Sequence, residues 1–351
     1  MDVVRRGASG DRPAVRLLVF NCHEAWVHQL GALGCELDII VGLKGHHVAG
    51  WDLRMRPLPP RARTLSLAQV LTEPARRVPA YDCIVAHNLT DLLDVKSLPG
   101  PRLLVVHSTY EGRLRSEQSE LPPDMLRQAI RRYLDQVGGH AVAVSRLKTG
   151  PGSFPADVVA AGVAVAAYPA CTAELAAGLR VVNQITQKRE VLLWEFHEAA
   201  FAGLPVALIG HNPDRPGIAP ARDWDDLKAT LAGHRFYIHT ADPRYEDGYN
   251  MAMLEAMAAG LPVLGNRHPT SPIEHGVSGF LADDPAAMRR HAESLLADRE
   301  LALRLGAAAR ATVARRFPLD RFARDFRRAI HKAQRKWRRS QPPGPRPRRA
   351  A

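Results

Sequence analysis

The first half of the chain alternates short apolar runs with longer stretches of mixed polarity. The runs lie at residues 15–20, 37–41, 83–86, 103–107 and 141–144. They are rich in Val, Ile and Leu and show no polar alternation, which is typical of parallel strands buried on both faces. Between them, residues 124–137 place apolar side chains at helical spacing. This alternation of strand and helix predicts a doubly wound α/β domain.

The second half repeats this architecture with a different sequence. Strands are predicted at residues 179–183, 205–210, 236–239, 262–265 and 280–282, and helices at 190–201, 224–232, 250–259 and 285–298. Asp223 or Asp225 is expected to cap the second of these helices. The stretch 150–178 is rich in Ala, Gly and Pro, so it is interpreted as the crossing between domains.

Two Rossmann-like domains are therefore expected to face each other across a cleft. The predicted divisions are an N-terminal acceptor-side domain at 1–165, a donor domain at 166–318, a closing helix at 319–335 that returns to the first domain, and a disordered tail at 336–351. Because ligands bind such sheets at the carboxyl ends of the strands, catalytic residues should follow strands and face the cleft.

The positive charge of the chain is concentrated at the C-terminus. The chain has 351 residues and a net charge of +12, and residues 327–351 contain ten Lys or Arg and no acid. The rest is thus nearly neutral (12 − 10 = about +2), and its pI says little about a ligand. No apolar run is long enough to span a bilayer. We expect a cytoplasmic protein, and the basic tail leaves open a peripheral contact with an anionic membrane at the inner face.

The chemistry is concentrated in residues 247–265, where strand, loop, helix and turn follow one another. Gly248 allows close approach of the backbone, and the first amides of the next helix suit a phosphate group. Glu255 lies in the second helical turn, where a carboxylate can accept hydrogen bonds from sugar or ribose hydroxyls. Asp247 can do the same from the loop. A simple dipole partner and a well-packed helix end are the structural alternatives.

The segment EDGYNMAMLEAMAAGLPVLG (246–265) resembles the donor-site signature of retaining GT-B glycosyltransferases of the family-4 (group 1) type. In that family two acids are separated by seven residues, as Asp247 and Glu255 are. SPIEHGVSGFLADD (271–284) and RRFPLDRF (315–322) resemble the segments that follow. The resemblance implies a hexosyl-type transferase, in EC 2.4, that moves a sugar from a nucleoside diphosphate sugar to a hydroxyl acceptor with retention. The acceptor is a glycan, a lipid or a small molecule.

The resemblance also implies roles for particular residues. Glu255 would hold the donor ribose and Asp247 would contact the transferred sugar. The residues expected to present backbone amides to the donor are Gly248, Tyr249, Asn250 and Met251. Lys188 would bind phosphate, while Gln184 stands where the family has Arg, with Arg189 as a substitute. The nucleotide sugar is a co-substrate, and neither a cofactor nor a metal is expected.

On the acceptor side, His107 ends a predicted strand and is a candidate catalytic residue near the reacting sugar. The alternatives are a structural histidine and a histidine that contacts only the acceptor. Cys22, His23 and His28 lack a fourth ligand at a familiar spacing, so they predict no metal site. Three other interpretations stay open: a GT-B epimerase or phosphorylase, a catalytically impaired homologue, and a polyanion- or membrane-binding protein that works through its tail without a specific nucleic acid.

Overall fold

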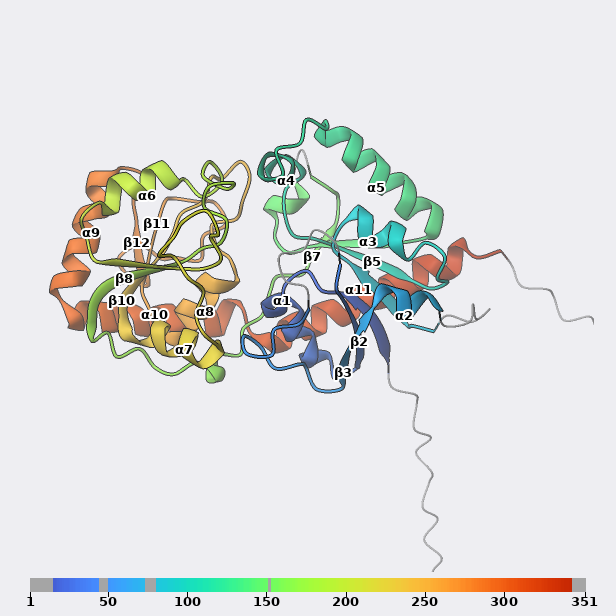
Figure 1. The fold of residues 1–351 in the computed structure, drawn as a ribbon, viewed down its shortest axis with the longest axis horizontal. Coiled ribbons are helices and arrows are strands. Elements are labelled where there is room, and N and C mark those ends of the chain that lie inside the picture. The colour runs from blue at the N-terminus through green and yellow to red at the C-terminus, as the bar shows by residue number, and fades with distance from the viewer. Residues whose placement is uncertain (1–14, 44–49, 73–79, 151–152, 343–351) are drawn as a thin grey trace, which may run out of the picture.

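The fold was analysed in a computed structural model, which describes residues 15–43, 50–72, 80–150 and 153–342 (Figure 1). These residues form two α/β domains with all-parallel sheets. Nothing is described for the N-terminal 14 residues or for residues 343–351, so most of the predicted tail lies outside the described part of the chain.

The N-terminal domain is built on a parallel sheet which, within the described residues, has seven strands in the order β3-β2-β1-β4-β5-β6-β7. Its strands are β1 (Arg16–Phe20), β2 (Glu36–Val41), β3 (Ala62–Ser66), β4 (Cys83–Ala86), β5 (Arg102–Val106), β6 (His140–Ala143) and β7 (Asp157–Val158). Its helices are α1 (Glu24–His28), α2 (Leu67–Thr72), α3 (Leu89–Asp94), α4 (Tyr110–Ser116) and α5 (Pro123–Val137), with 3-10 turns η1 (Gln29–Leu33) and η2 (Leu147–Thr149). The apolar runs predicted as strands are all strands, because both faces of this sheet are covered by helices.

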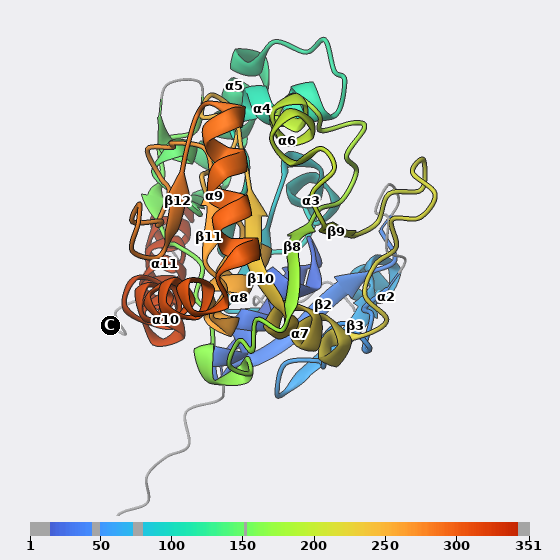
Figure 2. The ribbon, with the colours of Figure 1, turned by 90° about the vertical axis from the view of Figure 1, so that its left-hand side faces the viewer.

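The C-terminal domain repeats the plan with five described strands in the order β12-β11-β10-β8-β9. They are β8 (Leu175–Val181), β9 (Val206–Ile209), β10 (His234–His239), β11 (Val263–Gly265) and β12 (Gly279–Leu281). The helices are α6 (Trp194–Phe201), α7 (Trp224–Gly233), α8 (Met251–Ala259), α9 (Pro285–Ala297) and α10 (Arg299–Arg316), with the 3-10 turn η3 (Val165–Ala167) before β8. Side chains from α6 and α9 fill one core of this domain, and side chains from α7, α8 and the end of α10 fill the other. Figure 2 shows α6 at the opposite end of the domain from α7 and α10.

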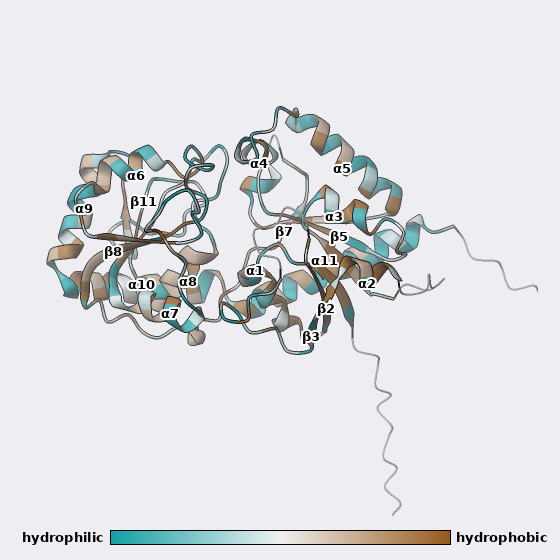
Figure 3. Ribbon diagram, viewed as in Figure 1, coloured by the Kyte–Doolittle hydropathy of each residue, from teal (hydrophilic) through white to brown (hydrophobic). Residues whose placement is uncertain are grey.

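The doubly wound fold predicted from the hydrophobic pattern is thus confirmed, and hydrophobic residues gather in the strands while polar ones lie on the outer helices (Figure 3). Asp223 is the cap of α7, because its carboxylate accepts from the amide of Asp226 at 2.8 Å. Helix α6 begins later than predicted, at Trp194, after a run of turns. Strand β3, helix α10 and the short helices α1, α2, α3 and α4 were not among the predicted elements.

The closing helix α11 (Leu319–Ser340) packs on the N-terminal sheet. Phe322 and Phe326 are buried there against Trp26, with ring centroids 6.2 and 5.9 Å from the indole. The helix runs to Ser340, so residues 336–340, predicted as part of a disordered tail, are helical. Within the described stretches, no helix combines the length and the apolar character that crossing a membrane would need.

Candidate functional site

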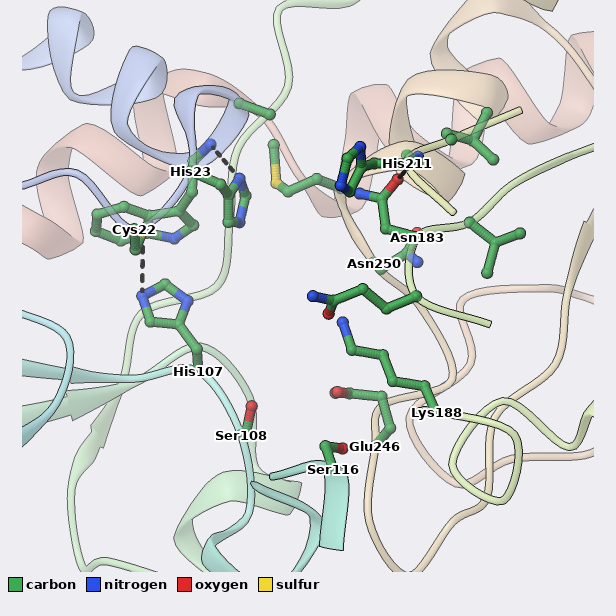
Figure 4. A pocket seen from close by; sticks show the side chains of 18 of the residues that line it. Cys22, His23, His107, Ser108, Ser116, Asn183, Lys188, His211, Glu246 and Asn250 are labelled. Carbon is green, nitrogen blue, oxygen red and sulfur yellow. Dashed lines mark hydrogen bonds between the residues drawn. The ribbon is translucent and has the colours of Figure 1, made fainter. Parts of the chain in front are cut away.

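A large cleft of about 1810 Å³ lies between the two domains. One wall is formed by residues that follow β1, β4 and β5 of the N-terminal sheet, and the other by residues that follow β8, β9 and β10 together with the start of α8. Figure 4 shows the two walls, with Cys22 and His107 on one side and Lys188, Glu246 and Asn250 on the other. The carboxyl ends of both sheets therefore meet in one space, as the doubly wound topology predicts.

The loop between β10 and α8 contributes the acids of this wall. Gly248 is a glycine because an added Cβ would lie 2.7 Å from the ring of His268. Its amide, which was predicted to face the donor, donates instead to Thr270 Oγ1 at 2.9 Å. Close packing against the loop between β11 and β12, rather than approach to a ligand, therefore accounts for this glycine in the present conformation.

Asp247 lines the cleft but is only 3% exposed. Its Oδ1 accepts a hydrogen bond from Ser145 Oγ at 2.7 Å, and its Oδ2 lies 3.5 Å from Lys148 Nζ. Burial raises the pKa of Asp247, and the nearby Lys148 and Ser145 only partly offset this effect. Both partners follow β6, so this acid of the donor segment is held by the opposite domain.

Lys148 is completely buried and pairs with the neighbouring acid, Glu246. Burial alone would raise the pKa of Glu246, but the charge and hydrogen bond of Lys148, together with the amide of Asp247 and the charge of His239, lower the pKa overall. Glu246 therefore stays ionised in the cleft. Sequence reasoning singled out neither residue, because a lysine shortly after a strand has no local signal that shows which acid it will meet.

Glu255 also has a partner from the N-terminal domain. It forms a buried ion pair with Arg56, whose side chain is 5% exposed against 6% for the glutamate. The guanidinium of Arg56 also lies 4.4 Å from the centroid of the Trp224 ring, a cation–π contact. One oxygen of the carboxylate predicted to hold the donor ribose, Oε1, is therefore already bonded, and a ligand that uses this oxygen has to replace Arg56.

The segment after β8 brings the expected phosphate-binding lysine to the cleft. Lys188 lines it, and burial lowers its pKa, with Glu246 opposing this effect. Gln184 lines it too, and adopts a left-handed φ of 55°. Its amide donates to His211 O at 3.0 Å, and its carbonyl accepts from the amide of Lys188 at 3.1 Å. Gln184 thus shapes the turn that presents Lys188.

The predicted substitute for the missing arginine, Arg189, is not part of this wall. It does not line the cleft, and it forms ion pairs with Glu195 and Glu198 at 2.9 and 3.0 Å at the start of α6. Arg180, on β8, is a cation that lines this wall beside Lys188, and sequence reasoning missed it because it lies inside a strand.

Arg180 is 2% exposed. Its Nη2 donates to the carbonyl oxygens of Leu192 and Thr240 at 3.0 and 3.4 Å, while Nη1 has no hydrogen-bond partner among the described residues. Burial lowers its pKa to about 10, so it remains a cation at neutral pH. A buried cation that bonds only to carbonyls is a costly feature unless an anion joins it.

The start of α8 is organised by Asn250, whose side chain accepts from the amide of Met253 at 2.8 Å and caps the helix. Tyr249 packs on Phe317 with ring centroids 5.1 Å apart. Met251 lines the cleft at the first position of the helix, where amides have no partner within the helix. Asn250 therefore positions the helix end through its side chain.

On the opposite wall, His107 follows β5 and belongs to a cluster with His87 and Cys22. Its Nε2 lies 2.9 Å from His87 Nδ1 and 3.9 Å from Cys22 Sγ. Burial, reinforced by His87, lowers the pKa of His107 well below its usual value, so the ring is neutral. Within the described contacts, His107 bonds to its own wall and not to the acids opposite.

Comparisons with known proteins agree with this arrangement. Residues 215–298, which include Asp247 and Glu255, match the sequence profile of the family described as glycosyl transferases group 1. No curated protein matches the chain in sequence.

Solved structures resemble nearly the whole chain. Sucrose-phosphate synthase from Thermosynechococcus elongatus superposes with a TM-score of 0.65 at 14% identity, over 91% of this chain and 98% of that one. HepE from Anabaena, in complex with UDP-glucose, gives 0.65 at 13% identity over 90% and 99%. A glycosyltransferase from Rickettsia africae gives 0.60 at 13% identity over 92% and 99%. At such identities the likeness concerns the fold, which is GT-B.

Proposed function

We propose that the protein transfers a sugar from a nucleoside diphosphate sugar to a hydroxyl group of an acceptor, with retention of configuration. The observation that carries this proposal is the position of the donor segment: Glu246, Asp247 and Glu255 all line the interdomain cleft. The segment lies inside the stretch that matches glycosyl transferases group 1. The spacing of Asp247 and Glu255 supports retention, because it is the spacing of the retaining family that the segment resembles.

The departing nucleoside diphosphate gains negative charge as the sugar leaves, and preorganised donors must stabilise that charge. Lys188 is one cation in the right place, and Arg180 is the second, with an Nη1 that lacks a partner among the described residues. Arg180 would thus supply the positive charge that the Arg of the resembled family provides and that the uncharged Gln184 cannot. Together with the first amides of α8, these cations make a metal unnecessary for the diphosphate.

In this proposal the three acids of the donor segment bind different parts of the donor. Glu255 binds the ribose hydroxyls once Arg56 has moved away. Glu246 and Asp247 face the transferred sugar, and Lys148 keeps their charges compensated between turnovers. His107 lines the acceptor wall, where a neutral imidazole can accept a hydrogen bond from an acceptor hydroxyl. Closure of the domains then excludes water from the reacting groups.

The test is a panel of nucleotide sugars, with UDP-glucose first, because HepE is the similar structure that holds it. Binding is measured by calorimetry and turnover by release of the nucleoside diphosphate. In an Arg56→Met background, where Glu255 has no ion pair to lose, Glu255→Gln should weaken donor binding at least tenfold, since a hydrogen bond to a charged group contributes about 1.5–3 kcal/mol. The matched control is Glu274→Gln, an exposed acid of the same domain outside the cleft. If the unmodified protein binds no nucleotide sugar, the proposal is wrong.

A second proposal is a peripheral contact with an anionic membrane, supported by the last turns of α11. Arg335, Lys336, Arg338 and Arg339 are exposed there, whereas Arg327 and Lys332 bond within the protein. Such a basic surface attracts anionic lipid headgroups. The double substitution Arg338→Glu, Arg339→Glu should abolish sedimentation with vesicles that contain phosphatidylserine. Equal sedimentation of both proteins would contradict this contact.

A further inference from the structure

Three side chains that can bind a metal ion converge on the N-terminal wall of the cleft. Cys22 Sγ and one ring nitrogen each of His87 and His107 lie within 4.8 Å of one another. They come from three neighbouring strands of the sheet, since β4 lies between β1 and β5. Each of the three follows the carboxyl end of its strand by one or two residues. The sheet itself therefore brings them together, on rigid elements rather than on a long loop.

The cluster is also held in place by its surroundings. Trp26, which is buried, meets the rings of His87 and His107 edge-on, with centroids 5.0 and 4.9 Å away. The indole in turn packs on Phe326 of α11. Both imidazoles are thereby fixed close to their observed orientation, which reduces the entropy that a ligand would have to remove on binding.

The distances fit a tetrahedral ion of the zinc type. Metal–sulfur and metal–nitrogen bonds of about 2.3 and 2.05 Å give sulfur–nitrogen and nitrogen–nitrogen edges of about 3.6 and 3.3 Å. The corresponding distances here are 3.9 Å from Cys22 Sγ to His107 Nε2 and 2.9 Å from His87 Nδ1 to His107 Nε2. Two of the three ligand–ligand distances are therefore within a few tenths of an ångström of those that the ion requires, and the third, from Cys22 to His87, is within 4.8 Å.

We propose that Cys22, His87 and His107 form a site for a zinc-type divalent transition metal, with the fourth coordination position open to the cleft. One thiolate and two imidazoles select such ions over Mg²⁺ and Ca²⁺, which prefer oxygen ligands. Binding releases the thiol proton to solvent and moves the proton shared by the two imidazoles to a ring nitrogen that faces away from the ion. All three residues line the cleft, so water or an acceptor group can reach the ion.

This inference is independent of the proposed transferase activity, because it concerns binding by the free protein. In the sequence, Cys22 lies near His23 and His28, and that grouping predicted no metal site. The cluster instead combines Cys22 with residues 65 and 85 positions further along the chain.

The experiment is a titration of the metal-free full chain with Co²⁺, which reports both geometry and sulfur ligation. A thiolate-to-cobalt charge-transfer band with tetrahedral visible absorption should saturate at one ion per chain, and Zn²⁺ should remove it. Cys22→Ser should abolish the charge-transfer band, and His87→Gln should weaken binding at least tenfold. Cys171→Ser, a partly exposed cysteine of the other domain, is the matched control and should leave the spectrum unchanged.

A second measurement needs no variant and stays informative if a substitution prevents folding. Zn²⁺ should slow the reaction of Cys22 in the unmodified protein with a thiol reagent, as followed by peptide mass spectrometry, while Cys171 reacts at an unchanged rate. An excess of Mg²⁺ should have no effect on either. The absence of a charge-transfer band, its survival in Cys22→Ser, or equal reactivity of Cys22 with and without Zn²⁺ would each overturn the proposal.

Discussion

The ion pair between Arg56 and Glu255 allows a sharp test of how the cleft takes a nucleotide sugar. The two side chains come from opposite domains and are both nearly inaccessible to solvent. If Glu255 binds the ribose of the donor through Oε1, it must first release Arg56. Replacing Arg56 by Met removes the charge and the hydrogen bond, and leaves a flexible apolar side chain to pack on Trp224.

The size of the effect follows from the bond that donor binding breaks. A hydrogen bond between charged groups contributes about 1.5–3 kcal/mol. A donor that has to break it loses that amount, so Arg56→Met should bind the donor about 10- to 150-fold more tightly, at about 1.4 kcal/mol per tenfold. The same variant should be less stable without ligand, because a buried carboxylate that loses its partner costs about 3–5 kcal/mol unless water reaches it.

The assay is calorimetric titration with the best donor of the panel, combined with thermal unfolding. Arg54→Met is the matched control, because Arg54 lies two residues away, is 76% exposed in its side chain and pairs only with Asp52 among the described residues. The control should bind the donor as the unmodified protein does. Equal or weaker binding by Arg56→Met would refute the reasoning, and weaker binding would mean that Arg56 itself contacts the donor.

Three further predictions concern stability. Gly306→Ala places a Cβ against the carbonyl of Gly260 where α10 crosses the end of α8. The free energy of unfolding, measured in urea, should therefore fall by about 1–3 kcal/mol. An unchanged value would show that the two helices can move apart at little cost. Burial lowers the pKa of His197 from 6.5 to about 3, so only the unfolded chain binds this proton and stability falls by about 2 kcal/mol between pH 6.5 and pH 5. His197→Phe should remove that loss, as measured by urea titrations at the two pH values, and an equal loss in the variant would contradict this. Lys148→Met leaves Asp247 and its neighbour as buried acids without a cation and should cost about 3–5 kcal/mol in the same assay, whereas a change below about 1 kcal/mol would contradict the pairing.

The pattern of hydrophobic positions was sufficient to predict the apolar strands and most of the longer helices. Strand β3 was not predicted because Ala62–Ser66 is a half-exposed edge strand, defined by its pairing with β2 rather than by apolar side chains. Helix α10 was not predicted as a separate helix because it follows α9 almost without interruption. The boundary between them is marked by Asp298, whose side chain accepts from the amide of Leu301.

The residues of the site also form two groups: some are placed by the local sequence, and others meet only through contacts between distant parts of the chain. Asp247 and Glu255 are placed by a continuous strand–loop–helix segment, so their type and spacing were readable in the sequence. Their partners, Ser145, Lys148 and Arg56, lie 102, 99 and 199 positions earlier in the chain. Which side chains meet across the cleft depends on how the two domains are packed, and no local pattern contains that information.

These cross-cleft contacts have a thermodynamic consequence for any donor. Arg56 pairs with Glu255, Ser145 bonds to Asp247, and Lys148 bridges to both acids of the loop, so every carboxylate of the donor segment is bonded to the N-terminal domain. A nucleotide sugar that uses these carboxylates competes with contacts that hold the domains together. Donor binding and domain separation must then be coupled, with each favouring the other by the same free energy. Catalysis requires the domains to close again with the donor in place, so the contacts that resist binding are the ones a bound sugar has to replace.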